Sequence, residues 1–143
     1  EFSKNSKNPV IDILPNQNLE KDDIGASMRL GTYPCKVKSN THAQEIYGNE
    51  IVYERHRHRY EVNNKYRNDL EANGLVFSGV SPDDDLIEMI ELKDHPFFVA
   101  SQFHPEFKSR PWEPAPMFNS FIKASKDINL STEKIDDSTK VRD

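Results

Sequence analysis

Short apolar stretches alternate along this chain with polar stretches that contain proline, glycine or asparagine. Apolar stretches of about four to eight residues, bounded in this way, are typical of strands. Gly31 and Thr32 predict a turn, and the polar residues 16–26 predict a loop. The pattern predicts strands at 9–14, 27–30, 33–38, 51–55, 75–80, 86–92 and 97–103.

Two of the predicted strands indicate their own place in a sheet. Residues 86–92 carry apolar side chains on both faces, so we expect this strand in the middle of a sheet. Pro34 lacks an N–H group, so we expect the strand at 33–38 to lie at an edge or to begin there. Many strands and few helices favour the C-terminal part of an α/β domain with β-hairpin segments.

Three stretches have the signals of helices, and the end of the chain has none. They are 41–47, 64–73 and 114–128. The first has Asn40 or Thr41 as its N-cap and Gly48 beyond its end. Gly74 ends the second, and the third carries an apolar stripe. Residues 129–143 are polar and lack a period, which predicts a disordered tail.

Composition limits the class of protein. A chain of 143 residues with 35% hydrophobic residues is long enough for one domain with a modest core. The formal net charge of −5 argues against a general nucleic-acid binder, and no apolar run reaches the length of a membrane span. A single cysteine, Cys35, forms no internal disulfide, so we expect a cytoplasmic, reducing location. The chain does not begin with Met, and we expect it to be a piece of a longer polypeptide.

The strongest candidate for chemistry is the pair His104 and Glu106, which follows the predicted strand at 97–103 and surrounds Pro105. In extended backbone, residues two apart share a face at roughly 6–7 Å between Cα atoms. A carboxylate at that spacing can reach an imidazole nitrogen, fix its tautomer and stabilise the imidazolium, as in a nucleophile–His–acid triad. The alternative for an arbitrary His-x-Glu pair is a histidine at a strand end beside a solvated glutamate.

A second candidate is the alternating basic run at 55–59, Arg-His-Arg-His-Arg. A strand would place its two histidines on one face and its arginines on the other. The run fits a solvated basic edge, a phosphate or nucleotide site, or an arginine that binds an α-amino-acid carboxylate. A metal site of His56, His58 and His104 is a further alternative, although adjacent arginines are poor neighbours for a cation.

Residues 102–107, Gln-Phe-His-Pro-Glu-Phe, resemble the His-Pro-Glu signature of class I glutamine amidotransferases. The stretches 28–31, 54–63 and 108–111 narrow the resemblance to the glutaminase domain of the CTP synthase family, over about residues 1–126. The resemblance implies the C-terminal portion of a flavodoxin-like, three-layer α/β sandwich. We therefore expect a domain at 1–126, followed by a polar, disordered tail at 127–143.

The resemblance also assigns roles to residues. It implies that His104 is the catalytic base and acid, that Glu106 orients it, and that Arg59 contacts the substrate glutamine. Glu1 aligns with a glutamine-contacting glutamate of the family, and the alternative is a frayed chain terminus. The family takes its nucleophile from a Gly-x-Cys-x-Gly motif that this chain lacks, and Cys35 fits a packing residue instead. We therefore expect the chain to be inactive by itself.

The resemblance finally implies a function for the whole protein. Glutamine would be hydrolysed to supply ammonia for the ATP-dependent amination of UTP to CTP in pyrimidine nucleotide biosynthesis. We expect no cofactor in this chain, ATP and Mg²⁺ in a synthase domain, and a homotetramer. GTP is a candidate allosteric activator, although the loop at 16–26 near that region is shorter than in many family members. The alternative function is a non-catalytic, glutaminase-like regulatory or interaction module.

Overall fold

Strands and short helices make up the body of the protein. The computed structural model describes residues 6–13 and 28–139. The strands are β1 (Ile11–Ile13), β2 (Arg29–Val37), β3 (Ile51–His58), β4 (Tyr60–Val62), β5 (Leu75–Val80), β6 (Ile87–Leu92) and β7 (Val99–Ser101). The helices are α1 (His42–Tyr47), η1 (Asn64–Tyr66), α2 (Arg67–Ala72), η2 (Pro105–Phe107) and α3 (Pro116–Thr139).

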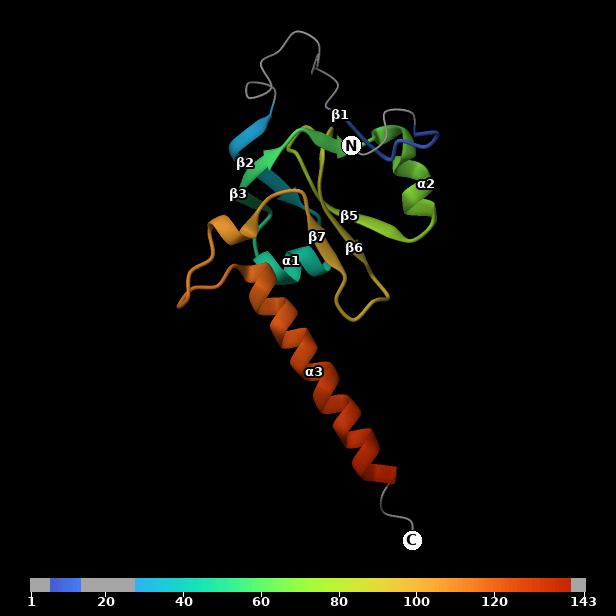
Figure 1. Cartoon of the computed structure of the whole chain (residues 1–143), viewed down its shortest axis with the longest axis vertical. Coiled ribbons are helices and arrows are strands. Elements are labelled where there is room, and N and C mark those ends of the chain that lie inside the picture. The colour runs from blue at the N-terminus through green and yellow to red at the C-terminus, as the bar shows by residue number, and fades with distance from the viewer. Residues whose placement is uncertain (1–5, 14–27, 140–143) are drawn as a thin grey trace.

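Five of these strands form one curled sheet in the order β3-β2-β5-β6-β7 (Figure 1). A second, two-stranded sheet pairs β1 with β4. All of these pairs are antiparallel. The prediction that 86–92 lies inside a sheet is confirmed, because β6 pairs with β5 on one side and β7 on the other.

The long pair of β2 and β3 corrects one prediction and explains another. Gly31 and Thr32 lie inside β2, opposite His56 and Arg55, so the predicted turn at 31–32 was wrong. The segment pairs with β3 throughout, and Gly31 takes a φ of 115° within the strand, which glycine tolerates. Strand β5 pairs only with residues 36 and 37 of β2, so around Pro34 the strand has one neighbour in the sheet. The missing N–H group of proline is tolerated at such a position.

Helix α1 lies between β2 and β3 in the sequence and has both of its predicted caps. The Thr41 side chain accepts a hydrogen bond from the Gln44 N–H group. Gly48 ends the helix in the left-handed region at φ 66°. A buried carboxylate from β6, that of Glu91, accepts hydrogen bonds of 3.0 and 3.1 Å from the N–H groups of the first two helical residues. A negative charge is favourable at this end of a helix.

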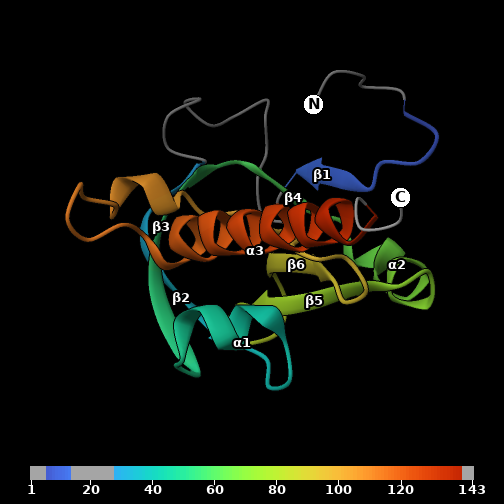
Figure 2. The ribbon, with the colours of Figure 1, turned by 90° about the horizontal axis from the view of Figure 1, so that it is seen from below.

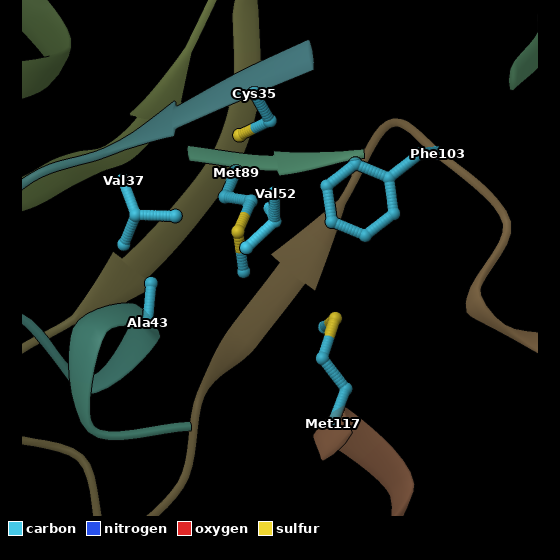
Figure 3. Close-up of a cluster of buried hydrophobic side chains, with 7 residues drawn as sticks. All are labelled: Cys35, Val37, Ala43, Val52, Met89, Phe103 and Met117. Carbon is cyan, nitrogen blue, oxygen red and sulfur yellow. The ribbon is translucent and has the colours of Figure 1, made fainter. Parts of the chain in front are cut away.

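The apolar core lies between the five-stranded sheet, α1 and the beginning of α3. Its buried side chains are Cys35, Val37, Ala43, Val52, Met89, Phe103 and Met117 (Figure 3). Gly79 of β5 lets the strands approach closely, because a Cβ atom there would lie 2.7 Å from the Cys35 sulfur. Phe103 anchors the segment that carries His104 to this core, so the position of the candidate histidine depends on core packing.

Helix α3 is longer than predicted and extends away from the sheets (Figure 1), so that in a view from below it lies in front of them (Figure 2). It continues to Thr139, whereas the sequence predicted a helix that ends at 128. The sequence after Pro116 contains no glycine or proline, the residues that most strongly end a helix. Residues 140–143 lie outside the described part of the chain. Within the described part, no helix has both the length and the apolar character needed to cross a membrane.

Candidate active site

His104 and Glu106 form a close pair at the end of β7. The Nδ1 atom of His104 lies 2.6 Å from Oε1 of Glu106. The strand ends at Ser101, earlier than predicted, and a 3₁₀ turn with Pro105 in its first position follows His104. The predicted pairing is therefore present, but a turn brings the two side chains together, where an extended strand was expected. The fixed φ angle of proline suits the start of such a turn.

The electrostatics of the pair suit proton transfer. The hydrogen bond from His104 lowers the pKa of Glu106 below its usual value, so this carboxylate is ionised at neutral pH. The Glu106 carboxylate accepts a hydrogen bond from the Nδ1–H group of His104. The Nε2 atom is therefore the nitrogen that can exchange a proton with a reactant. The His104 side chain is 36% exposed, and its ring stacks on that of Phe107 at 5.0 Å between centroids. The imidazole is thus oriented and still accessible.

The loop that carries this pair is attached to β3 at both of its ends. The His104 N–H group donates to the Arg55 carbonyl at 2.8 Å. After the 3₁₀ turn, the Lys108 Nζ atom donates to the Tyr53 carbonyl at 2.6 Å and lies 3.4 Å from a carboxylate oxygen of Glu54. These contacts place the histidine against the strand that also carries the basic run.

Strand β3 separates the members of the basic run as predicted. Arg55 and Arg57 are exposed, whereas His56 is buried and His58 is nearly so. Arg59 follows the end of β3, in the connection to β4. It lines a cavity of about 570 Å³ together with Ile11, Met28, Arg57, His58, Tyr60 and Gln102. Glu1 lies outside the described residues, so its predicted role is untested.

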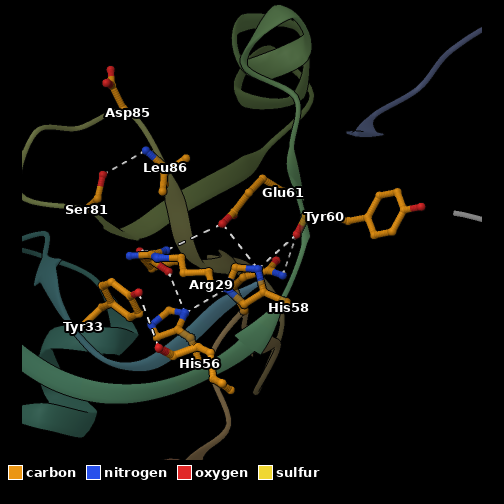
Figure 4. A network of polar contacts seen from close by, with 12 residues as sticks. Arg29, Tyr33, His56, His58, Tyr60, Glu61, Ser81, Asp85 and Leu86 are labelled. Atoms are coloured by element: carbon orange, nitrogen blue, oxygen red, sulfur yellow. Dashed lines mark hydrogen bonds and ion pairs between the residues drawn. The ribbon is translucent and has the colours of Figure 1, made fainter. Parts of the chain in front are cut away.

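Next to this cavity lies a buried ionic cluster (Figure 4). Arg29 of β2 approaches Oε1 of Glu88 at 2.5 Å and Oε1 of Glu61 at 3.6 Å. Burial and the negative charge of Glu88 raise the pKa of Glu61 to about 7, although Arg29 acts in the opposite direction. Burial likewise raises the pKa of Glu88, and Arg29 again opposes it. The Tyr33 ring covers the guanidinium at 4.6 Å.

Two neutral imidazoles connect this cluster to the cavity. Burial, and then the charge of Arg29, lower the pKa of His56 to about 3 and that of His58 to about 4. The Nδ1 atom of His58 lies 3.2 Å from the Tyr60 carbonyl, which can only accept, so this nitrogen carries the proton. The Nε2 atom of His58 then accepts a hydrogen bond from Nδ1 of His56 at 2.9 Å.

Comparison with known proteins shows the family to which the chain belongs. Residues 8–124 match the family model for glutamine amidotransferase class-I. This chain belongs to the class I glutamine amidotransferase family. The CTP synthase of Caldanaerobacter subterraneus subsp. tengcongensis is 58% identical over 131 residues, which are 92% of this chain and 24% of that protein. The CTP synthase of Moorella thermoacetica is 60% identical over 125 residues, 87% of this chain and 23% of that protein.

A solved structure shows the same fold. The glutaminase domain of Trypanosoma brucei CTPS, with bound acivicin, has a TM-score of 0.81 and 37% sequence identity to this amidotransferase chain. The match covers 89% of this chain and 49% of that one. The mixed α/β fold class predicted from the sequence is therefore confirmed. The chain spans about a quarter of the length of the curated relatives that it matches.

Two alternatives for site residues of this amidotransferase chain find no support. Cys35 is fully buried, and burial raises the pKa of its thiol to about 12, so it is a packing residue as predicted. For the three-histidine metal site, His56 and His58 bond to each other. Among residues 6–13 and 28–139, no group of three or more His, Cys, Asp or Glu side chains is arranged to hold a metal ion.

Sequence reasoning missed the ionic cluster and the role of Gln102. Arg29 and Glu88 are far apart in the sequence and meet only through the order of strands in the sheet. Gln102 donates from Nε2 to the Tyr60 carbonyl at 3.0 Å. One signal was available: Glu88 is a charged residue within the otherwise largely buried strand β6, and buried charges in proteins are usually paired.

Proposed function

We propose that this chain is the glutaminase portion of a CTP synthase. In the proposed reaction, glutamine is hydrolysed and its ammonia is used for the ATP-dependent amination of UTP to CTP. The observation that carries the proposal is the His104–Glu106 pair, 2.6 Å apart, within the family's fold. The similarity to CTP synthases along 92% of the chain supports this member of the family over other glutamine amidotransferases.

The pair supports a defined sequence of proton transfers. A cysteine from elsewhere in the full-length protein gives its thiol proton to Nε2 of His104, and the resulting thiolate attacks the side-chain amide carbon of glutamine to form a tetrahedral species. His104 then donates a proton from Nε2 to the departing nitrogen, which leaves as ammonia, and a thioester remains. His104 next takes a proton from water as the water attacks the thioester, and glutamate and the thiolate are released. Glu106 stabilises the imidazolium during both steps.

Arg59 is proposed to hold the α-carboxylate of glutamine by a charge-assisted hydrogen bond. Its place in the wall of the 570 Å³ cavity, beside Gln102 of the segment that leads to His104, supports this role. Glu1 is proposed to contact the same substrate, on the strength of the family alignment alone. Arg57 lines the same cavity, but its side chain is exposed whereas that of Arg59 is half-buried, which favours Arg59 as the ligand.

The remaining parts of the proposal concern the full-length protein. UTP, ATP and Mg²⁺ belong to its synthase domain, the assembly is a homotetramer, and the location is the cytoplasm. GTP remains a candidate activator, but the loop at 16–26 that bears on it lies outside the described residues. The buried, weakly acidic Cys35 thiol supports the expectation that this chain does not hydrolyse glutamine by itself.

Replacement of His104 tests the proposed function. In the full-length protein, His104→Ala should abolish CTP formation from glutamine, because the leaving nitrogen loses its proton donor. CTP formation from added ammonia should stay at the wild-type rate, since that reaction bypasses the glutaminase site. The measurement is the rate of CTP formation from UTP and ATP, with glutamine or with an ammonium salt.

His95→Ala is the matched control, because His95 lies in the turn between β6 and β7 and is exposed. It should leave both rates unchanged. An equal loss of both rates in His104→Ala would contradict the role given to His104. Full glutamine-dependent activity in that variant would likewise contradict that role, whereas wild-type protein that forms CTP from ammonia but not from glutamine would favour the non-catalytic module.

A further inference from the structure

Two hydrogen bonds connect the segment that carries His104 to the segment that carries Arg59. The His104 N–H group donates to the Arg55 carbonyl of β3 at 2.8 Å. Two residues earlier, Gln102 donates from its side-chain Nε2 atom to the Tyr60 carbonyl at 3.0 Å. The first bond joins the backbone of the catalytic histidine to β3. The second reaches past the end of that strand to the residue that follows Arg59.

The position of the Tyr60 carbonyl is also fixed by a second hydrogen-bond donor. His58 donates to the same oxygen from Nδ1 at 3.2 Å, and His56 in turn holds His58 at 2.9 Å (Figure 4). A carbonyl oxygen has two lone pairs, so both bonds can form together. The turn with Arg59 is thus held from the strand before it, through His58, and from the neighbouring segment, through Gln102.

The backbone of Gln102 is itself fixed. Its N–H group donates to the Glu88 carbonyl at 2.8 Å, which extends the pairing of β7 with β6 by one more bond. The Glu88 side chain beneath this point is buried and paired with Arg29 at 2.5 Å. Gln102 therefore projects from a rigid part of the sheet, and its side chain can transmit that rigidity to the turn.

We propose that Gln102 is a positioning residue that sets the distance between Arg59 and His104 and thereby the affinity for glutamine. The proposal rests on the proposed function, in which Arg59 binds the α-carboxylate and His104 acts at the side-chain amide. Those two groups lie at opposite ends of the substrate, so the site must hold Arg59 and His104 at a set separation. A small displacement of a binding group is costly in enzymes.

The two connections predict different kinetic effects. Loss of the Gln102 side-chain donor frees the Arg59 turn on one side and leaves the backbone bond of His104 to Arg55 in place. Substrate binding should weaken, whereas proton transfer from His104 should not change. The expected signature is therefore a higher KM for glutamine at a nearly constant kcat.

Gln102→Met in the full-length protein tests this, because methionine keeps the length of the side chain and lacks the donor. The KM for glutamine should rise roughly tenfold, a typical effect of one lost hydrogen bond, with kcat within about twofold of wild type. Gln102→Glu, which keeps the shape and puts a carboxylate oxygen at the carbonyl, should raise the KM further. The ammonia-dependent rate should not change in either variant.

Asn64→Leu is the matched control, because Asn64 also donates a side-chain amide to a distant carbonyl, that of Asp85, at 2.6 Å. It should leave the KM for glutamine unchanged. An unchanged KM in Gln102→Met overturns the proposal, and so does a fall in kcat as large as the rise in KM, which indicates a general folding role. Wild-type protein that forms CTP from ammonia but not from glutamine, or from neither, would instead refute the proposed function.

Discussion

Two glutamates that each lie near a histidine behave in opposite ways in this protein. Glu106 is about half exposed and accepts a hydrogen bond from His104, which lowers its pKa. Glu61 lies 3.4 Å from His58 but is buried beside Glu88, and its pKa rises to about 7. The exposed carboxylate keeps its charge and can stabilise an imidazolium. The buried carboxylate of Glu61 instead lies 3.6 Å from Arg29 within the ionic cluster and has a structural role.

Glu106→Gln tests the importance of that charge. The amide keeps the size of the side chain, but it does not stabilise an imidazolium at position 104 as a carboxylate does. In the full-length protein, kcat for glutamine hydrolysis should fall by about two orders of magnitude, in the range typical of acid–base groups. Glutamate release is the measurement, and Glu113→Gln, an exposed residue after the same turn, is the control. A kcat within twofold of wild type would show that Glu106 is a solvated residue with no role in the reaction.

At the scale of elements, the sheet and α1 depend on each other through one side chain. Glu91 belongs to β6, and its two carboxylate oxygens accept the first two helical N–H groups of α1. A helix of this length is marginal by itself, because few backbone hydrogen bonds offset the cost of starting it. The buried carboxylate therefore fixes α1 against the core, where Ala43 packs beside Val37 and Met89.

Glu91→Gln should weaken this connection. The amide keeps one acceptor oxygen but places an NH₂ group against a helical N–H group, so one buried donor loses its partner. The free energy of unfolding should fall by about 2 kcal/mol, the cost of an unpaired buried polar group. Urea unfolding measures it. Glu45→Gln, an exposed change in the first turn of the same helix, should cost less than about 0.5 kcal/mol. Equal effects of the two changes would contradict the assignment.

At the scale of the whole molecule, buried titratable groups make stability depend on pH in two opposing ways. His56 and His58 have folded pKa values of about 3 and about 4, below the unfolded value of 6.5. Their contribution is complete above pH 6.5 and is lost as the pH falls through 4 for His58 and through 3 for His56. Glu61 has a folded pKa of about 7, above its unfolded value of 4.5. Its contribution is complete below pH 4.5 and is lost as the pH rises through 7.

Glu61→Gln should reveal how strongly His56 and His58 make the free energy of unfolding depend on pH. Between pH 6.5 and 4.5, folded wild-type protein retains a proton on Glu61 that the unfolded chain has released, and this offsets part of the loss from the histidines. Without it, the free energy of unfolding should fall more steeply on acidification, by up to about 1.4 kcal/mol per pH unit. Urea unfolding at several pH values measures the slope. Glu71→Gln, an exposed change in α2, should leave the slope unchanged, and equal slopes for all three proteins would refute the account.

The sequence by itself determined the features that depend on residues close together in the chain. The caps of α1 at Thr41 and Gly48 are local, and so is the His104–Glu106 pair. Most strands could be placed for the same reason, since alternation is a local pattern. Where a local signal pointed the wrong way, as at Gly31, pairing with a neighbouring strand overrode it.

Only the tertiary structure decided which distant groups meet. The register of β2 with β3 places Arg29 opposite His58, and the order of strands brings Glu88 against Arg29 and His56. The same arrangement carries Gln102 to the Tyr60 carbonyl, 42 positions away in the chain. Such contacts depend on the register and order of strands, which propensity and periodicity do not specify. The His104–Glu106 pair was therefore readable from the sequence, whereas the contacts that join its segment to β3 and to the turn with Arg59 were not.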